Sequence, residues 1–229
     1  MRVEASTIEG ILDEANSAVE EGSGLEGTGF WNAVATVKRD PALIPRFADR
    51  ISEIDRRAFL SWALVTLPIV SGTVLMVIAT VVGVGLIGSS FFTEDELTKL
   101  AVFAVGFGVV FVTTHGLAHL AVGRAVGIRF THWFIGTIGR PQPGVKIEYA
   151  SYLSTDPESR AWMHASGAIV SKAIPFLLLG VANAADLPSW ALWALAAIGV
   201  VSVATDILWS TSKSDWKKFK RERRLAQAS

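Results

Sequence analysis

Apolar residues in this chain gather into four long runs that polar segments separate. The runs cover about residues 59–88, 100–126, 162–183 and 190–209. Each reaches the length of about 20 residues that a helix needs to cross a hydrocarbon core about 30 Å thick. The pattern therefore predicts four transmembrane helices in a membrane domain over residues 58–209.

The N-terminal region, residues 1–57, is more polar and carries two helical patterns. Apolar residues recur at helical spacing from Ile8 to Val19, and a second helix is predicted over residues 42–57. Because both patterns are amphipathic, we expect a solvated or interface-lying region outside the membrane domain.

A short β-hairpin is predicted between the second and third apolar runs. Two segments of strand character, residues 128–135 and 145–149, flank a stretch rich in glycine and proline over residues 139–144. The expected fold class is thus mainly α: a polytopic membrane protein with about four transmembrane helices, a hairpin over residues 128–150, a helical N-terminal region and a basic tail over residues 210–229.

Basic residues are distributed unevenly among the connections. They gather before the first run, between the second and third runs, and in the tail, whereas the first run's exit loop has only Lys99 and the third connection has none. The positive-inside rule then predicts an integral, multi-pass membrane protein with both termini cytoplasmic and membrane lipid as a partner.

Composition narrows the chemistry further. The chain is 51% hydrophobic, has 21 basic and 21 acidic residues, and contains no cysteine. The balanced charge gives no reason to expect a nucleic-acid partner. Without cysteine, disulfides, thiolate metal sites and thiol nucleophiles are excluded, so histidine, aspartate or glutamate must hold any metal.

Two histidines, His115 and His119, lie four residues apart within the second apolar run. At this spacing both imidazoles project from one face of a helix. Polar rings in hydrocarbon are costly unless they are paired, so the pair marks a candidate functional site. The spacing is that of the zinc-binding HExxH motif, with Gly116 at the position of the glutamate.

A carboxylate at a similar depth would complete a metal site. At 1.5 Å per residue, His119, His115 and Asp206 lie about 10, 16 and 5 Å from the cytoplasmic ends of their helices. Two imidazoles and one carboxylate, with an open fourth position, are typical of catalytic zinc. We therefore expect His115, His119 and Asp206 to bind zinc.

Each of these residues could have a structural role in place of metal binding. His115 and His119 could instead form interhelical hydrogen bonds. Asp206 could form an ion pair with Lys172 of the third run, and this role could coexist with metal binding. Haem ranks below zinc, because two histidines one turn apart on one helix cannot ligate one iron from opposite sides.

Two further histidines receive supporting roles, and one acidic residue receives none. His132 on the hairpin and His164 at the start of the third run are expected to support the site or contact substrate rather than bind metal. Asp215, in the basic tail, is expected to be solvated.

The histidine pair in a membrane helix, the hairpin after it, the small-residue helix start at residues 165–168 and the late carboxylate resemble the site-2 protease family of intramembrane zinc metalloproteases. The resemblance covers about residues 100–216. It implies a metalloendopeptidase with zinc as cofactor, acting on a membrane-embedded protein or peptide. By position, His115 and His119 match the first two zinc ligands, and Asp206 is the best match for the third.

Two departures from the family's pattern affect what the resemblance implies. The segment around Asp206 lacks the family's Asn, Pro and Asp-Gly, and Gly116 replaces the glutamate that acts as general base. General acid–base catalysis is typically worth 10² to 10⁴ in rate, so we expect an inactive or strongly impaired protease. Glu148 is a candidate replacement base, but its alternation with Lys146 favours a strand-surface residue.

Two other functions stay open at this point. The chain could be a non-proteolytic membrane protein that binds or sequesters transmembrane partners. A small transporter that relays protons or ions through Lys172 and Asp206 is a weaker alternative, because four spans are few for a transporter.

Overall fold

The computed structural model describes residues 5–137, 143–208 and 214–228, and the chain forms two compact units. The first unit combines residues 1–69 with residues 124–156, and the second combines residues 70–123 with residues 157–229. The chain therefore leaves the first unit after residue 69 and returns to it over residues 124–156, whereas the sequence pattern predicted a boundary at residue 57.

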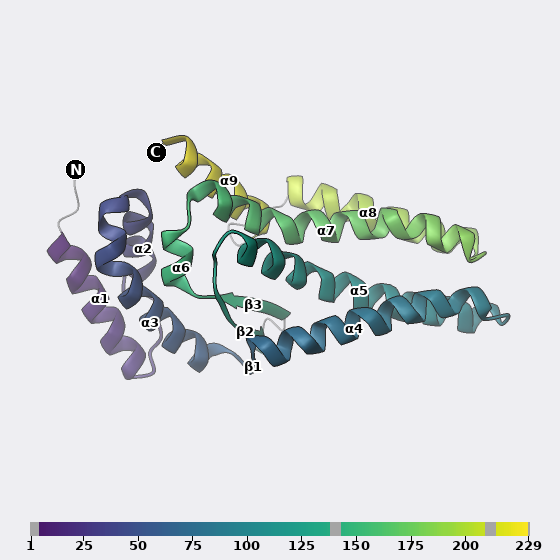
Figure 1. Ribbon diagram of the computed structural model, residues 1–229, viewed down its shortest axis with the longest axis horizontal. Coiled ribbons are helices and arrows are strands. Elements are labelled where there is room, and N and C mark those ends of the chain that lie inside the picture. The colour runs from purple at the N-terminus through teal and green to yellow at the C-terminus, as the bar shows by residue number, and fades with distance from the viewer. Residues whose placement is uncertain (1–4, 138–142, 209–213, 229) are drawn as a thin grey trace. The chain divides into compact units, whose positions relative to one another are not determined.

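Four helices build most of the first unit: α1 (Ala5–Glu20), α2 (Phe30–Arg39), α3 (Ile44–Trp62) and the short α6 (Tyr149–Ser154). A 3₁₀ turn, Pro41–Leu43, joins α2 to α3. Figure 1 shows α1 in purple and α2 and α3 in dark blue. The two helices predicted in the N-terminal region are present as α1 and α3, whereas α2 and α6 were not predicted.

These helices enclose a hydrophobic core of their own. Apolar side chains of α1, α2 and α3 pack against Ala150 and Leu153 of α6, and Ile8, Leu12, Phe30 and Ile51 are among the fully buried ones. The N-terminal helices therefore share a buried core with α6, and the expectation that this region is solvated or lies at the membrane interface stays a prediction. Ala150 and Leu153, which complete this core, lie about one hundred positions later in the chain.

A three-stranded antiparallel sheet completes the first unit, in the order β1 (Val65–Pro68), β2 (Phe130–Ile135) and β3 (Pro143–Ile147). The pairing of β2 with β3 confirms the predicted hairpin, and residues 138–142, which connect the two strands, lie outside the described residues. The strand β1 was expected to be part of the first span. It is extended because Ala63 ends α3 in a β conformation and Leu67 then pairs with Trp133.

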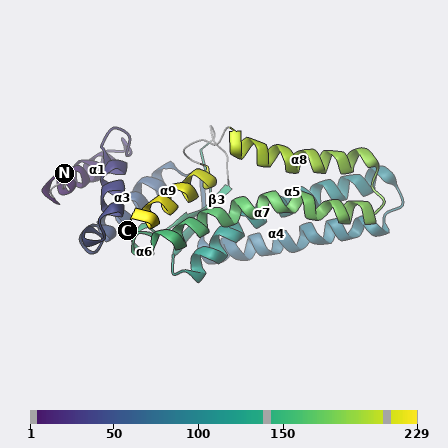
Figure 2. The same cartoon turned by 90° about the horizontal axis from the view of Figure 1, so that it is seen from above.

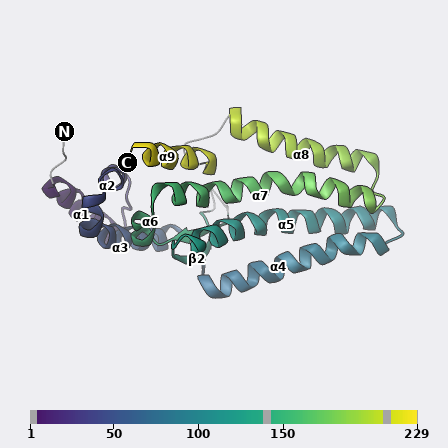
Figure 3. The same cartoon turned by 45° about the horizontal axis from the view of Figure 1, so that its top comes forward.

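Four long helices make up most of the second unit: α4 (Ile69–Ser89), α5 (Glu96–Ala125), α7 (Pro157–Ala184) and α8 (Ser189–Leu208). A 3₁₀ turn, Ser90–Phe92, follows α4. Within the described parts of the chain these four are long and apolar enough to cross a membrane, as predicted, although the first begins at Ile69 instead of residue 59. Figure 3 shows them side by side.

Small residues allow close approach between neighbouring long helices. A Cβ added at Gly106 of α5 would lie 2.6 Å from the carbonyl oxygen of Gly83 on α4, so the two backbones nearly touch there. Nearby, the Thr80 hydroxyl of α4 donates to the Thr113 hydroxyl of α5 at 2.8 Å. Such contacts stabilise helix pairs in a membrane and hold α5 in a fixed position.

A fifth helix of the second unit, α9 (Asp215–Ala228), lies along the first turns of α7 (Figure 2). Arg160 of α7 donates to the Glu222 carboxylate at 2.9 Å, and these two side chains are 1% and 0% exposed. The Trp162 and Phe219 rings meet at 5.6 Å between centroids. The basic tail is therefore a docked helix that starts beside α5 and α7.

Candidate metal centre

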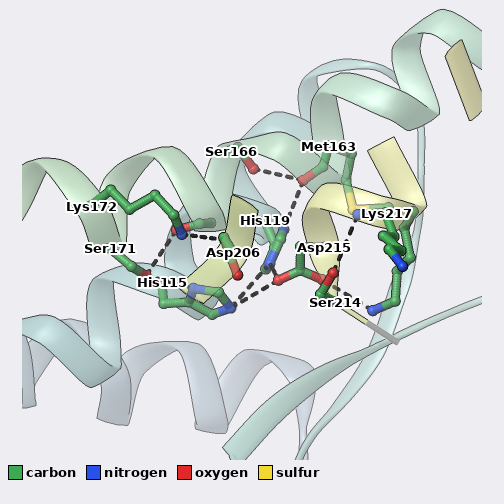
Figure 4. A network of polar contacts seen from close by, with 12 residues as sticks. His115, His119, Met163, Ser166, Ser171, Lys172, Asp206, Ser214, Asp215 and Lys217 are labelled. Carbon is green, nitrogen blue, oxygen red and sulfur yellow. Dashed lines mark hydrogen bonds and ion pairs between the residues drawn. The ribbon is translucent and has the colours of Figure 1, made fainter. Parts of the chain in front are cut away.

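Three side chains of the second unit converge on one point (Figure 4). His115 and His119 come from one face of α5, and Asp215 comes from the first residue of α9. The two Nε2 atoms are 3.3 Å apart, and the Asp215 Oδ2 atom lies 3.1 Å from His119 Nε2 and 3.3 Å from His115 Nε2. The described residues thus include a group of two imidazoles and one carboxylate that could share an ion.

The imidazole of His119 is held between α5 and α7. Its Nδ1 lies 2.7 Å from the carbonyl oxygen of Met163. Because a carbonyl only accepts hydrogen bonds, Nδ1 carries the proton and donates it, which leaves the Nε2 lone pair directed at the cluster. The ring lies directly over Gly167, where an added Cβ would be 2.3 Å from Nε2, so only glycine leaves room for it.

The imidazole of His115 is fixed in the same tautomer by Ser171 of α7. The Ser171 hydroxyl donates to the carbonyl oxygen of Gly167 at 2.9 Å and lies 2.7 Å from His115 Nδ1. Since its only proton is used in that bond, the hydroxyl accepts a hydrogen bond from Nδ1. The Nε2 atom of His115 therefore also presents a lone pair to the cluster.

Three lone-pair atoms consequently face one another at 3.1 to 3.3 Å with no donor among them when both imidazoles are neutral. Such an arrangement is repulsive unless a proton or a metal cation lies between the atoms. The other Asp215 oxygen, Oδ1, accepts a hydrogen bond from Lys218 at 3.0 Å and is thereby oriented away from the histidines.

The spacing of the three atoms fits a small divalent metal. Ligand atoms at tetrahedral angles and about 2.0–2.1 Å from zinc are separated by about 3.3–3.4 Å. The measured separations of 3.1 to 3.3 Å are close to this value. The donor set and its geometry therefore both fit zinc, with His115, His119 and Asp215 as the residues that would hold it.

The electrostatic setting keeps Asp215 ionised. Burial of its carboxyl group would raise the pKa of Asp215, but with the imidazoles in their charged form, hydrogen bonds from His115 and His119 and the charges of His119 and Lys218 outweigh burial and lower this pKa well below its usual range. Asp215 also lies in the first turn of α9, where the helix dipole favours a negative charge. A charged carboxylate is the form that binds a metal.

Asp206, the third ligand expected from the sequence, is not in this group. Its carboxylate forms an ion pair with Lys172 of α7, which was the alternative role considered for it. Asp215 takes its place in the group and is only 20% exposed, contrary to the expectation that it would be solvated. The sequence pointed to Asp206 because depth in the membrane was estimated only for residues within the four predicted spans. Asp215 belongs to α9, which follows the last span, and was therefore not considered as a ligand.

The sequence around Asp215 contains a helix signal that would have indicated an ordered position for this residue. Residues 214–225 read as Ser-Asp followed by aromatic and basic residues at helical spacing, which is the pattern of a capped amphipathic helix. The Ser214 hydroxyl indeed accepts from the Lys217 backbone N–H at 3.3 Å, and places Asp215 in the first turn. What the sequence did not reveal is the surface on which this helix docks.

The remaining candidates lie in different surroundings. Gly116 is buried on α5 between the two histidines, and His164 is buried on α7. His132 and Glu148 belong to the first unit. His132 contacts the Phe59 ring, and Glu148 caps α6 through the Ser151 backbone N–H and pairs with Arg129.

No protein-family model, curated protein or solved structure was found to match the chain. The fold and the cluster by themselves define a mainly helical protein with four potential membrane-spanning helices and a candidate metal centre of two histidines and one aspartate. The resemblance to site-2 proteases therefore stays an expectation from the sequence.

Proposed function

We propose that this chain is an intramembrane zinc-binding protein of the site-2 protease type, with the metal held by His115, His119 and Asp215. The observation that carries the proposal is the convergence of His115 Nε2, His119 Nε2 and Asp215 Oδ2 at 3.1 to 3.3 Å. The Nδ1 atoms of both histidines are already used as donors to α7, so their Nε2 atoms are available to a cation.

Ligand chemistry favours zinc over the common hard cations. Calcium and magnesium prefer oxygen ligands, whereas two imidazole nitrogens with one carboxylate suit zinc and leave a fourth position open. The resemblance to site-2 proteases points to the same metal. Because Asp215 replaces Asp206 in the proposal, the third ligand comes from outside the four long helices.

Bound zinc would polarise a substrate carbonyl and lower the pKa of water to about 7. The chain's own residues would orient the imidazoles, since Ser171 and the Met163 carbonyl fix both rings. Gly116 has no side chain that could accept or return a proton. We therefore expect peptide-bond hydrolysis to be weak or absent.

The proposed topology follows from the distribution of basic residues. Four spans with both termini cytoplasmic place the metal centre in the cytoplasmic half of the membrane domain. For substrate, we propose a membrane-embedded protein or peptide with an extended segment. Among the described residues, β1 and β3 are the edge strands of the three-stranded sheet, and edge strands bind extended peptides by strand addition.

Metal analysis of purified protein tests the site. We expect about one zinc per chain in the wild type, and none in a His115→Ala/His119→Ala double variant. Asp215→Asn should weaken zinc binding by about 10- to 100-fold or more. Asp206→Asn is the matched control and should keep wild-type affinity. Loss of zinc in Asp206→Asn with retention in Asp215→Asn, or no zinc in the wild type, contradicts the proposal.

The Gly116→Glu variant distinguishes a disabled protease from a binding protein. It should be reconstituted in vesicles with a fluorescently labelled transmembrane peptide as probe. Cleavage that depends on zinc supports a protease disabled at its general base. Stoichiometric zinc without cleavage favours the second candidate, a non-proteolytic protein that binds membrane partners, which the missing base at Gly116 already suggests.

A further inference from the structure

Charges on α9 are separated between its two faces. Its two acidic residues, Asp215 and Glu222, turn towards the protein and are 20% and 0% exposed. Most of its basic residues turn outward instead. Spacings of three, one and three residues place these on one side of the helix, and they form what we call the basic face: Lys217, Lys220, Arg221 and Arg224.

The contacts of α9 with α7 fix which way this face points. The buried Arg160–Glu222 ion pair holds the middle of the helix, and Arg223 bonds to Glu158 at 2.8 Å one residue later. A rotation of α9 about its axis would bury basic side chains and expose the Glu222 carboxylate. The basic face therefore stays on the outside of the second unit as long as α9 is docked.

The position of α9 along the chain places it beside the membrane surface. It packs on the first turns of α7, where that helix changes from polar to apolar residues, and it follows the potential span α8. Trp162, Trp216 and Phe219 lie together at this level, with the last two rings stacked at 5.1 Å. Clustered tryptophans of this kind are typical of the membrane–water interface.

We propose that the basic face of α9 is a binding surface for the anionic headgroups of phospholipids in the adjoining leaflet. Four positive charges with exposed side chains, held at interface depth on a rigid helix, complement negatively charged headgroups. Each basic residue near an anionic membrane surface strengthens association by about five-fold. The residues of the basic face and the ion pairs of α9 with α7 lie outside the metal centre.

The test uses the whole chain in nanodiscs, where both sides of the membrane are accessible. Association of spin-labelled phosphatidylglycerol is compared with that of spin-labelled phosphatidylcholine by electron paramagnetic resonance. We expect the wild type to prefer phosphatidylglycerol several-fold at 50 mM salt and much less at 500 mM salt, because salt screens exposed charges. A Lys220→Gln/Arg221→Gln/Arg224→Gln variant should lose most of this preference.

A matched control removes the same charge elsewhere. Arg39→Gln/Arg46→Gln/Arg56→Gln neutralises three exposed arginines of the first unit and should leave the lipid preference unchanged. An equal loss in both triple variants, or none in the α9 variant, overturns the proposal. So does release of the bound lipid by a few millimolar inorganic phosphate at constant ionic strength, since this would indicate a site for free phosphate.

Discussion

At the scale of single residues, the position of His119 depends on Gly167, which has no side chain. Gly167 leaves the space that the His119 ring occupies, and the same residue's carbonyl accepts the hydroxyl proton of Ser171. Glycine is a poor helix former and costs about 1 kcal/mol relative to alanine inside a helix. At this position the cost is offset by the hydrogen bonds that α7 makes with both histidines, which need the close approach of α7 to α5.

A Gly167→Ala substitution should displace His119 and weaken zinc binding by about 10- to 100-fold, although alanine is the better helix former. The added methyl group would lie 2.3 Å from Nε2, so the ring must move. Gly180→Ala is the control on the same helix, because a Cβ at Gly180 has nothing within 4 Å. Zinc titration of the two variants checks the prediction, and equal affinities would contradict it.

At the scale of elements, α9 is held to α7 by an ion pair that is almost completely buried. Such pairs are weak sources of net stability, but removing one partner is costly because the other charge stays buried alone. The Arg160–Glu222 pair therefore acts less as a source of stability than as a constraint on how α9 docks. Correct docking is what brings Asp215 to the two histidines.

Glu222→Gln should loosen α9 and weaken zinc binding, at a cost of about 3–5 kcal/mol in docking free energy. Arg223→Gln, which breaks the exposed pair with Glu158, should cost no more than about 1 kcal/mol. Since the chain has no cysteine, a label at a cysteine introduced at Gln227 reports the mobility of α9. A charge-swapped Arg160→Glu/Glu222→Arg variant that restores docking supports the pairing, and equal mobility in all variants argues against it.

The short helix α6 allows a prediction about pH. Burial would raise the pKa of Glu148, but hydrogen bonds from Ser151 and the charge and hydrogen bond of Arg129 outweigh it and lower the pKa. A lowered pKa means that the charged Glu148 stabilises the folded state above the unfolded pKa of about 4.3, and that this contribution is lost as pH falls through the folded value.

Glu148→Gln should therefore reduce hydrogen-exchange protection of the Ser151 amide at pH 7, by about 1 kcal/mol as for the loss of a helix cap. The difference from wild type should shrink as the pH falls below about 4. The exposed Glu26→Gln variant serves as control and should match wild type throughout. A difference that persists undiminished at pH 3 would show that charge on Glu148 is not the cause.

At the scale of the whole molecule, the sequence predicted what depends on local pattern and missed what depends on distant packing. Four apolar runs and a hairpin were recognisable because length and alternation are local properties. The strand β1 was predicted as part of the first transmembrane run, because residues such as Leu67 are as apolar as those of a membrane helix. Only the pairing of Leu67 with Trp133 shows that this segment is a strand.

The candidate site was predictable to the same extent. His115 and His119 were found because their spacing within one helix is itself the signal. Asp215 was missed because its proximity to them depends on how α9 docks against α7, which no pattern around Asp215 reveals. The Asp206–Lys172 pair shows the opposite case, in which two opposite charges in apolar helices predict each other.

If zinc bridges α5 and α9, removing it should affect the whole second unit. We expect a chelator to speed tryptic cleavage within α9 by about ten-fold or more, since a ligand present at 100 times its Kd adds about 2.7 kcal/mol to the state that binds it. Cleavage at arginines of the first unit should not change and provides the internal control. Equal cleavage of α9 with and without chelator would show that no metal links the two helices.

The origin of Asp215 in α9 also sets an order of events during synthesis. His115 and His119 are made in the second long helix, 100 and 96 residues before Asp215, and α7 and α8 are made in between. A nascent chain that has just completed all four long helices therefore has only two of the three ligands. The centre can close only after translation has passed Asp215, so a half-made chain in the membrane has no complete site with which to capture a metal ion.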